Sequence, residues 1–92
     1  MKPPFASTHL ILNHLVNELR SRGLWVERHS YSFRVMYCGK IVASFHIYPY
    51  HKEIHVRLYS GVDEIDTYLK NTLEETFIKI MGDYKIIFNR VL

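Results

Sequence analysis

The stretch 41–59, IVASFHIYPYHKEIHVRLY, decides how this chain folds. Apolar side chains alternate with polar or aromatic ones on both sides of Pro49–Lys52, which is typical of two half-buried strands joined by a loop. The sequence therefore predicts a β-hairpin with strands at Ile41–Tyr48 and Glu53–Tyr59.

The loop of this hairpin sets its register. A four-residue loop pairs Tyr48 with Glu53, and every pair farther from the loop follows from that first one. Phe45 then lies opposite Val56, so the hairpin has one apolar face and one polar face. A slip of one residue would expose a whole apolar row.

The turn before this hairpin, Cys38-Gly39-Lys40, admits two lengths. A two-residue turn would place Val35 and Ala43 on opposite faces, whereas a three-residue turn with glycine in a left-handed bulge pairs them on one face. We expect the three-residue turn for that reason. A tight turn at His29-Ser30 then adds Val26 to the apolar face.

An amphipathic helix flanks the strands on each side. The first is expected over about residues 8–22, capped by Ser7 or Thr8. The second follows Ser60–Asp63, which has the spacing of a capping box, and it ends at Gly82. Each helix has one apolar stripe, so both are expected to pack on the apolar face of the sheet.

These elements predict an α+β fold in the order α-β-β-β-β-α-β. We expect an antiparallel sheet of four to five strands with two helices packed on one face. Its strands are expected at Leu24–Arg28, Tyr31–Tyr37, Ile41–Tyr48, Glu53–Tyr59 and Tyr84–Val91. The place of the last strand in the sheet stays open. We interpret residues 1–92 as a single domain, with a loose N-terminal arm over residues 1–6 because Pro3-Pro4 cannot begin a helix interior.

Composition narrows the kinds of partner. The net charge is +3, but residues 1–60 hold eight basic and three acidic side chains, whereas residues 61–92 hold four basic and six acidic ones. A polyanion would therefore be attracted to the first two-thirds of the chain. The single cysteine fits a reducing compartment, and the apolar stretch 10–19 is too short and too polar to span a membrane. We expect a cytoplasmic protein with no membrane partner.

The face opposite the helices is expected to be open. It would carry Trp25, Glu27, Arg34, Met36, Val42, Ser44, His46, Tyr48, Glu53, His55, Arg57 and Tyr59. Aromatic rings stack on bases and cations neutralise phosphates, so this face suits RNA or single-stranded DNA. The candidate binding residues are Trp25, Arg34, His46, Tyr48, His55, Arg57 and Tyr59.

A second hypothesis uses the same open face. Tryptophan, tyrosine and arginine are also enriched at the centres of protein interfaces, so a protein partner or a homodimer is about equally expected. Nucleic-acid binding would weaken steeply with added salt, whereas an apolar interface would be nearly indifferent to it.

No catalytic residue, metal or cofactor is expected. His46 and His55 are cross-strand neighbours in the predicted register, but a zinc site needs three or four ligands. The chain has no glycine-rich phosphate loop and no nucleophile elbow. The sequence therefore favours a small non-catalytic binding module.

The order α-β-β-β-α over residues 8–80, with a helix that runs through Gly23 into an aromatic strand, loosely resembles double-stranded RNA-binding domains and the small HicA-type RNase toxins. The second resemblance implies an RNase in which His29, in the segment Trp25–Ser30, is the general base. The glycine that normally precedes that histidine is missing, and an extra strand is predicted. We therefore keep the RNase as the less favoured alternative.

Overall fold

The computed structural model describes the backbone of residues 4–91 and the side chains of residues 9–91. Two helices and five strands follow one another in the predicted order α-β-β-β-β-α-β. Their bounds are α1 Pro4–Ser21, β1 Trp25–His29, β2 Ser32–Tyr37, β3 Lys40–Tyr48, β4 Glu53–Leu58, α2 Asp63–Met81 and β5 Lys85–Arg90.

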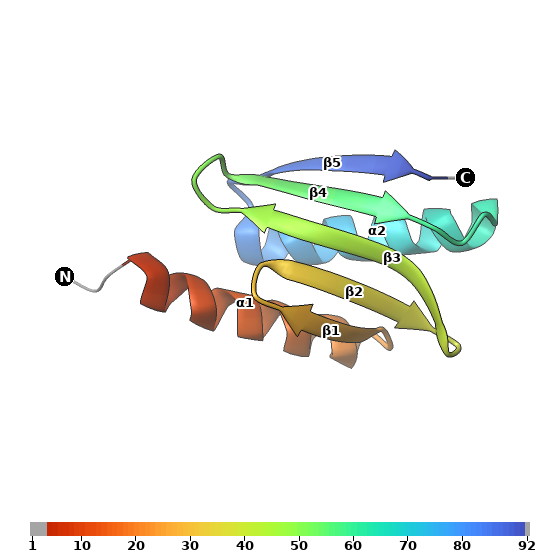
Figure 1. Ribbon diagram of the computed structural model, residues 1–92, viewed down its shortest axis with the longest axis horizontal. Coiled ribbons are helices and arrows are strands. Elements are labelled where there is room, and N and C mark those ends of the chain that lie inside the picture. The colour runs from red at the N-terminus through yellow and green to blue at the C-terminus, as the bar shows by residue number, and fades with distance from the viewer. Residues whose placement is uncertain (1–3, 92) are drawn as a thin grey trace.

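The strands form one sheet in the order β1-β2-β3-β4-β5 (Figure 1). β1 to β4 are antiparallel neighbours joined by short turns. β5 lies at the edge beside β4 and runs parallel to it, because α2 carries the chain back to the end of the sheet where β4 begins. The predicted α+β class is confirmed, but the sheet is mixed and not wholly antiparallel.

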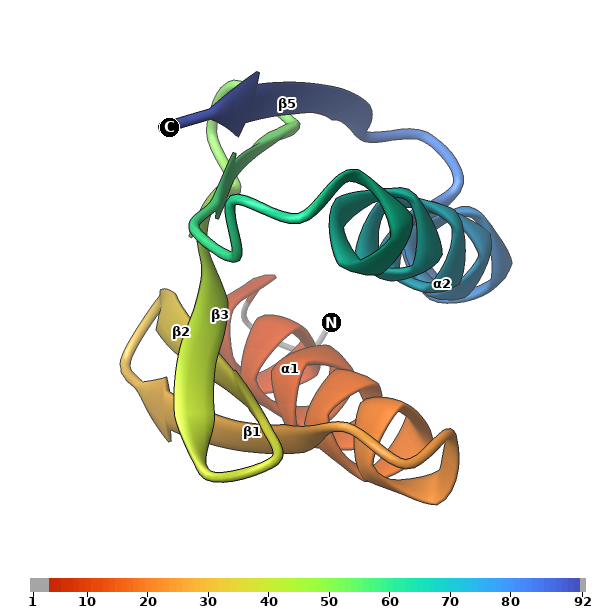
Figure 2. The same ribbon diagram turned by 90° about the vertical axis from the view of Figure 1, so that its right-hand side faces the viewer.

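Both helices pack on the same face of the sheet, as predicted from their apolar stripes (Figure 2). Leu12 and Leu15 of α1 and Leu69 of α2 are fully buried in the shared core. The ring of Phe45 stacks on Phe33 with centroids 4.5 Å apart. We call this side of the sheet the covered face, and the opposite side, where no described helix lies, the open face.

The register of the β3–β4 hairpin is the predicted one. Tyr48 pairs with Glu53, and Phe45 pairs with Val56, so the apolar residues of both strands point to the covered face. The loop between the strands has four residues, and Lys52 closes it with a φ of 51°.

The turn between β2 and β3 differs from the expected one. It has two residues, because Tyr37 pairs directly with Lys40, and Cys38 and Gly39 both have positive φ, as this kind of tight turn requires. Val35 nevertheless pairs with Ala43, because a β-bulge between Val35 and Met36 adds one residue to β3. The bulge corrects the slip that a two-residue turn would otherwise cause.

The start of α1 also differs from the prediction. The helix begins at Pro4, before the expected caps Ser7 and Thr8, because a proline in the first helical turn needs no hydrogen-bonded N–H. The loose arm predicted over residues 1–6 is therefore wrong for residues 4–6, and residues 1–3 lie outside the described residues.

The predicted capping box of α2 is not formed. Val62 is the N-cap residue and no side chain caps the helix. Ser60 Oγ instead accepts a hydrogen bond from the Val62 N–H at 3.1 Å and donates one to Asp66. Serine turns toward Asp66 because that carboxylate, 5% exposed, has little water to satisfy it.

Asp66 also fixes the end of β5. Its Oδ2 accepts a hydrogen bond from Arg90 Nε at 2.9 Å, and Arg90 Nη2 reaches Asp63 Oδ1 at 2.7 Å. The nearby carboxylates hold the pKa of Arg90 above its ordinary value, first through the hydrogen bond to Asp63. α2 therefore ties the parallel edge strand to the rest of the sheet through charge as well as packing.

Candidate functional site

The open face is built from rows of cross-strand neighbours. One row runs Arg34, Ser44, Arg57 and Asn89 across β2, β3, β4 and β5. The next row holds Ser32, His46, His55 and Ile87 in the same strand order. Alternate residues of a strand share a face. The row that lies between these two, which includes Phe33, Phe45 and Val56, therefore points into the core.

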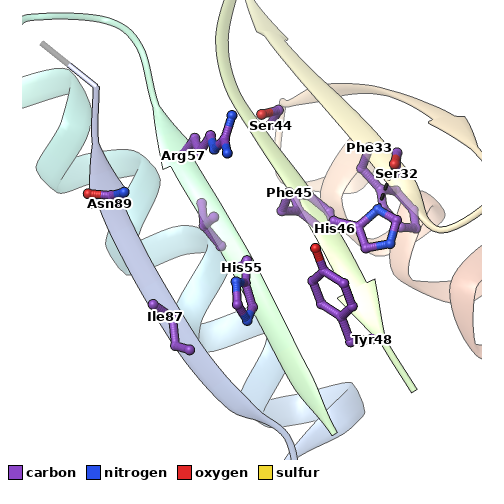
Figure 3. Close-up of a pocket in the computed structure, with 11 residues that line it drawn as sticks. Ser32, Phe33, Ser44, Phe45, His46, Tyr48, His55, Arg57, Ile87 and Asn89 are labelled. Atoms are coloured by element: carbon purple, nitrogen blue, oxygen red, sulfur yellow. Dashed lines mark hydrogen bonds between the residues drawn. The ribbon is translucent and has the colours of Figure 1, made fainter. Parts of the chain in front are cut away.

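Tyr48 lies against two imidazoles. Its ring centroid is 4.5 Å from that of His46, which precedes it by two residues on β3, and 4.8 Å from that of His55 on β4. Figure 3 shows the tyrosine between the two histidines, with its hydroxyl directed along the face toward the row of Ser44 and Arg57. The planes of the two imidazoles are tilted by 55° and 60° from that of the tyrosine, and we call these three rings the ring cluster (His46, Tyr48 and His55).

Hydrogen bonds hold both imidazoles. His46 Nδ1 lies 2.7 Å from Ser32 Oγ, and His55 Nε2 lies 3.0 Å from Glu53 Oε1. The hydrogen bond from His55 lowers the pKa of Glu53 below its ordinary value of 4.5, so Glu53 is an anion at neutral pH and its carboxylate accepts this hydrogen bond from the imidazole N–H. Two of the three rings of the cluster are thus held in place by hydrogen bonds within the protein.

A shallow hollow lies beside the ring cluster. Its volume is about 290 Å³. Its lining comes from four neighbouring strands and comprises Ser32, Phe33, Ser44, Phe45, His46, Tyr48, His55, Val56, Arg57, Ile87 and Asn89. Figure 3 shows the guanidinium end of Arg57 directed toward β3 and Ser44, above this hollow. Rings, a cation and an amide therefore converge on one concave surface.

The arginines of the open face differ from the other four. Arg20, Arg22, Arg28 and Arg90 each donate a side-chain hydrogen bond within the protein. Arg34 and Arg57 make no ion pair, hydrogen bond or ring contact with any residue that the structure describes. Two cations that the fold leaves unused are thus placed on either side of Ser44.

The structure gathers most of the predicted binding residues and separates one. His46, Tyr48, His55 and Arg57 line the same hollow, and Arg34 lies one strand beyond Ser44. Tyr59 joins this group through a hydrogen bond of 3.0 Å between its hydroxyl and Ser44 Oγ.

Trp25 lies apart from the ring cluster. It pairs with Met36 near the other end of the face, roughly 20 Å along the strands from Tyr48 at about 3.3 Å per residue. The residue is 54% exposed, and the guanidinium of Arg20 lies over its ring, 4.4 Å from the ring centroid. One side of the indole is therefore already occupied.

One residue predicted for the open face is buried. Val42 is only 6% exposed, because the β-bulge turns it to the covered face together with Ala43. Ile41 takes its place on the open face opposite Met36, and it is 47% exposed.

Sequence reasoning missed three open-face residues that line the hollow, Ser32, Ile87 and Asn89. Ser32 was within reach of prediction, because it precedes Arg34 by two residues and so shares its face. Ile87 and Asn89 had no signal in the sequence, since they join the face only through the position of β5 beside β4.

The remaining candidates acquire no partners. His29, the general base implied by the RNase resemblance, is exposed at the end of β1, and no hydrogen bond to another described residue orients its ring. Among the side chains of residues 9–91, no group of three His, Cys, Asp or Glu could hold a metal ion. Neither described helix is long and apolar enough to cross a membrane.

No family model, no curated protein and no solved structure matches this chain. The side chains of the open face are therefore the ground for a functional conclusion.

Proposed function

We propose that this protein binds single-stranded nucleic acid, RNA or DNA, through the open face. The observation that carries the proposal is the pair of arginines without internal partners, Arg34 and Arg57, beside an oriented cluster of three rings. Single strands expose both a charged backbone and the flat faces of their bases, and this face offers a contact for each.

The arginines are the phosphate contacts in this proposal. A guanidinium that forms no internal ion pair keeps its donors for a ligand, and it gives up no existing hydrogen bond when a phosphate arrives. Arg34 and Arg57 lie two strands apart, which is about 10 Å from the spacing of neighbouring strands. They can therefore contact separate phosphates of one strand.

The ring cluster is the base contact. Tyr48 is 39% exposed, and its neighbours His46 and His55 hold it in place without covering it. Stacking of a base on an aromatic ring contributes about 1–3 kcal/mol and tolerates any sequence. We therefore expect weak preference among bases and strong dependence on salt.

The test measures fluorescence anisotropy of labelled single-stranded RNA and DNA at several salt concentrations. Affinity should fall with salt, and Arg57→Ala should reduce the slope of log K against log salt by about 0.7, the loss of one phosphate contact. Arg28→Ala is the matched control, because it removes the same charge from the other face, where Arg28 bonds to Asn13. Equal losses in both variants would contradict a specific role for the open face.

A protein partner or a homodimer held by the open face is the second candidate. Exposed apolar side chains at the Trp25 end favour it, since Ile41 is 47% exposed next to Met36. Binding would then be nearly indifferent to salt, and the fluorescence of Trp25, the only tryptophan, would shift to shorter wavelength on association. No anisotropy change with any oligonucleotide, together with this shift, would favour the second candidate.

A further inference from the structure

The two edge strands of the sheet, β1 and β5, differ in whether side chains bond to their outward backbone groups. At the β1 edge, the carbonyl of Val26 accepts a hydrogen bond of 2.9 Å from Arg20 Nη2, and the same guanidinium lies over Trp25. A helix side chain thus occupies a backbone group that another strand would need. Covering an edge in this way is a known protection against unwanted pairing.

At the β5 edge, Lys70 Nζ lies over the Phe88 ring, 5.6 Å from its centroid, but no described side chain hydrogen-bonds to a backbone group of this strand. The backbone hydrogen bonds between β5 and β4 begin with Lys85 N to Lys52 O (2.8 Å) and end with Val91 N to Leu58 O (3.0 Å). Because backbone groups of a strand point alternately to its two sides, those of Ile86 and Phe88 point away from β4. No residue that the structure describes hydrogen-bonds to them. Figure 1 shows β5 as the outermost strand, with no described element beyond it.

The middle of β5 is apolar, and Ile86 and Phe88 pack against the core on the covered face. Ile86, Ile87 and Phe88 are all partly exposed, and the charged residues Lys85 and Arg90 stand at the two ends of the strand. A charge in the middle of an edge strand is one device that prevents pairing, and β5 lacks it. The edge therefore combines free main-chain groups with an apolar centre.

We infer that β5 pairs with β5 of a second copy of this chain, antiparallel, about a twofold axis that passes beside Ile87. Only residues whose backbone groups face outward can exchange hydrogen bonds, so Ile86 pairs with Phe88 of the second copy and Phe88 with its Ile86. Ile87 then faces Ile87 of the second copy.

The charges agree with this register. Lys85 lies opposite Asn89 of the second copy, so no like charges meet along the edge. Asp83, which precedes β5 and pairs with Lys52 at 2.7 Å, comes to the end of the strand where Arg90 of the second copy, itself paired with Asp63 and Asp66, lies. An antiparallel arrangement thus places the acidic residue that precedes one strand beside the basic end of the other strand.

This assembly goes beyond the proposed function and does not depend on it. An axis normal to the sheet keeps both open faces on the same side of one continuous sheet of ten strands. Ile87 and Asn89 line the hollow of each copy, so the two hollows would flank the axis. The assembly leaves the open face accessible, unlike a dimer that buries it.

The first experiment is sedimentation velocity of the protein without nucleic acid, over a wide range of concentrations. We expect a dimer that dissociates on dilution, and we expect Ile87→Lys to make it monomeric because two lysines would meet at the axis. Trp25→Lys is the matched control at the β1 edge and should leave the dimer intact. A monomer at every concentration would overturn the inference and leave the edge free for a strand of another protein. A dimer broken by Trp25→Lys and not by Ile87→Lys would overturn it too.

The second experiment tests the register directly, in a Cys38→Ser background that removes the only native cysteine. Residues facing each other in a pair without hydrogen bonds have Cα atoms about 4.5 Å apart, within reach of a disulfide. Ile87→Cys should therefore give a covalent dimer when oxidised with diamide, whereas Asn89→Cys, which faces Lys85, should not. Linkage through position 89 and not through position 87 would contradict the proposed axis.

Discussion

The covered and open faces belong to the same strands, yet they are determined by different requirements. On the covered face, Phe33 and Phe45 are almost fully buried and each has a packing partner in the core. On the open face, Arg34 and Arg57 lie on either side of Ser44 and make no ion pair, hydrogen bond or ring contact with any residue that the structure describes. Packing explains the residues of the covered face, but it explains neither the cations nor the rings of the open face. The composition of the open face is therefore the better guide to function.

The sharpest test of this contrast removes one ring from each face. Phe77 is completely buried and meets the ring of Phe45 edge-on, with centroids 5.0 Å apart. Phe77→Ala should lower the free energy of unfolding by about 3–5 kcal/mol in urea denaturation, through lost burial and a cavity. Tyr48→Ala should change it by about 0.5 kcal/mol while weakening oligonucleotide binding. A large loss of stability in Tyr48→Ala would mean that the open face serves the fold after all.

A second, smaller effect on stability is expected at Asp66, which is the one buried carboxylate among the described side chains. Asp66→Asn should reduce the free energy of unfolding by about 1–3 kcal/mol, because Arg90 loses a charged acceptor in a site with little water. Asp63→Asn is the control, since Asp63 pairs with the same arginine but is 85% exposed and should contribute little. Equal effects in urea denaturation would show that burial is not what makes the Asp66 contact matter.

The smallest effect is a dependence on pH at the open face. The hydrogen bond from His55 places the pKa of Glu53 below 4.5, so this contact stabilises the fold above that pH and is lost as pH falls through the lower value. The difference in unfolding free energy between the wild type and Glu53→Gln should therefore be full at neutral pH and shrink below pH 4.5. A difference that stays constant in urea denaturation down to pH 2 would contradict the contact.

Much of the fold was predictable because local signals agreed. The loop Pro49–Lys52 fixed the β3–β4 register, and with it the pairing of His46 with His55. The β-bulge was not predictable, because Cys38-Gly39-Lys40 permits both turn lengths and nothing in the sequence marks Val42 as an inserted residue. The expectation that one face would be apolar predicted the pairing of Val35 with Ala43 correctly. The chain reaches this pairing through a two-residue turn and a β-bulge, not through a three-residue turn.

The limits of the site prediction have one physical source. Pairing between distant segments is not encoded in local periodicity, and β5 joins the sheet after a whole helix. Asp66 shows the same limit, because a carboxylate on an apolar helix face is expected to face solvent until its partner Arg90 is placed. The prediction therefore found the open-face lining of the hollow on β3 and β4, and it missed Ser32 of β2 and Ile87 and Asn89 of β5.

The parallel pairing of β5 has a consequence for the time course of folding. Tyr48 and Glu53 pair across four residues, whereas Glu53 and Lys85 must close a segment that includes all of α2. Closing a longer segment costs more chain entropy before any contact repays it, so we expect the four antiparallel strands to assemble first and β5 to dock last. β4 would be the provisional edge until then. Because Ile87 and Asn89 arrive with β5, the hollow would be complete only at the final step of folding.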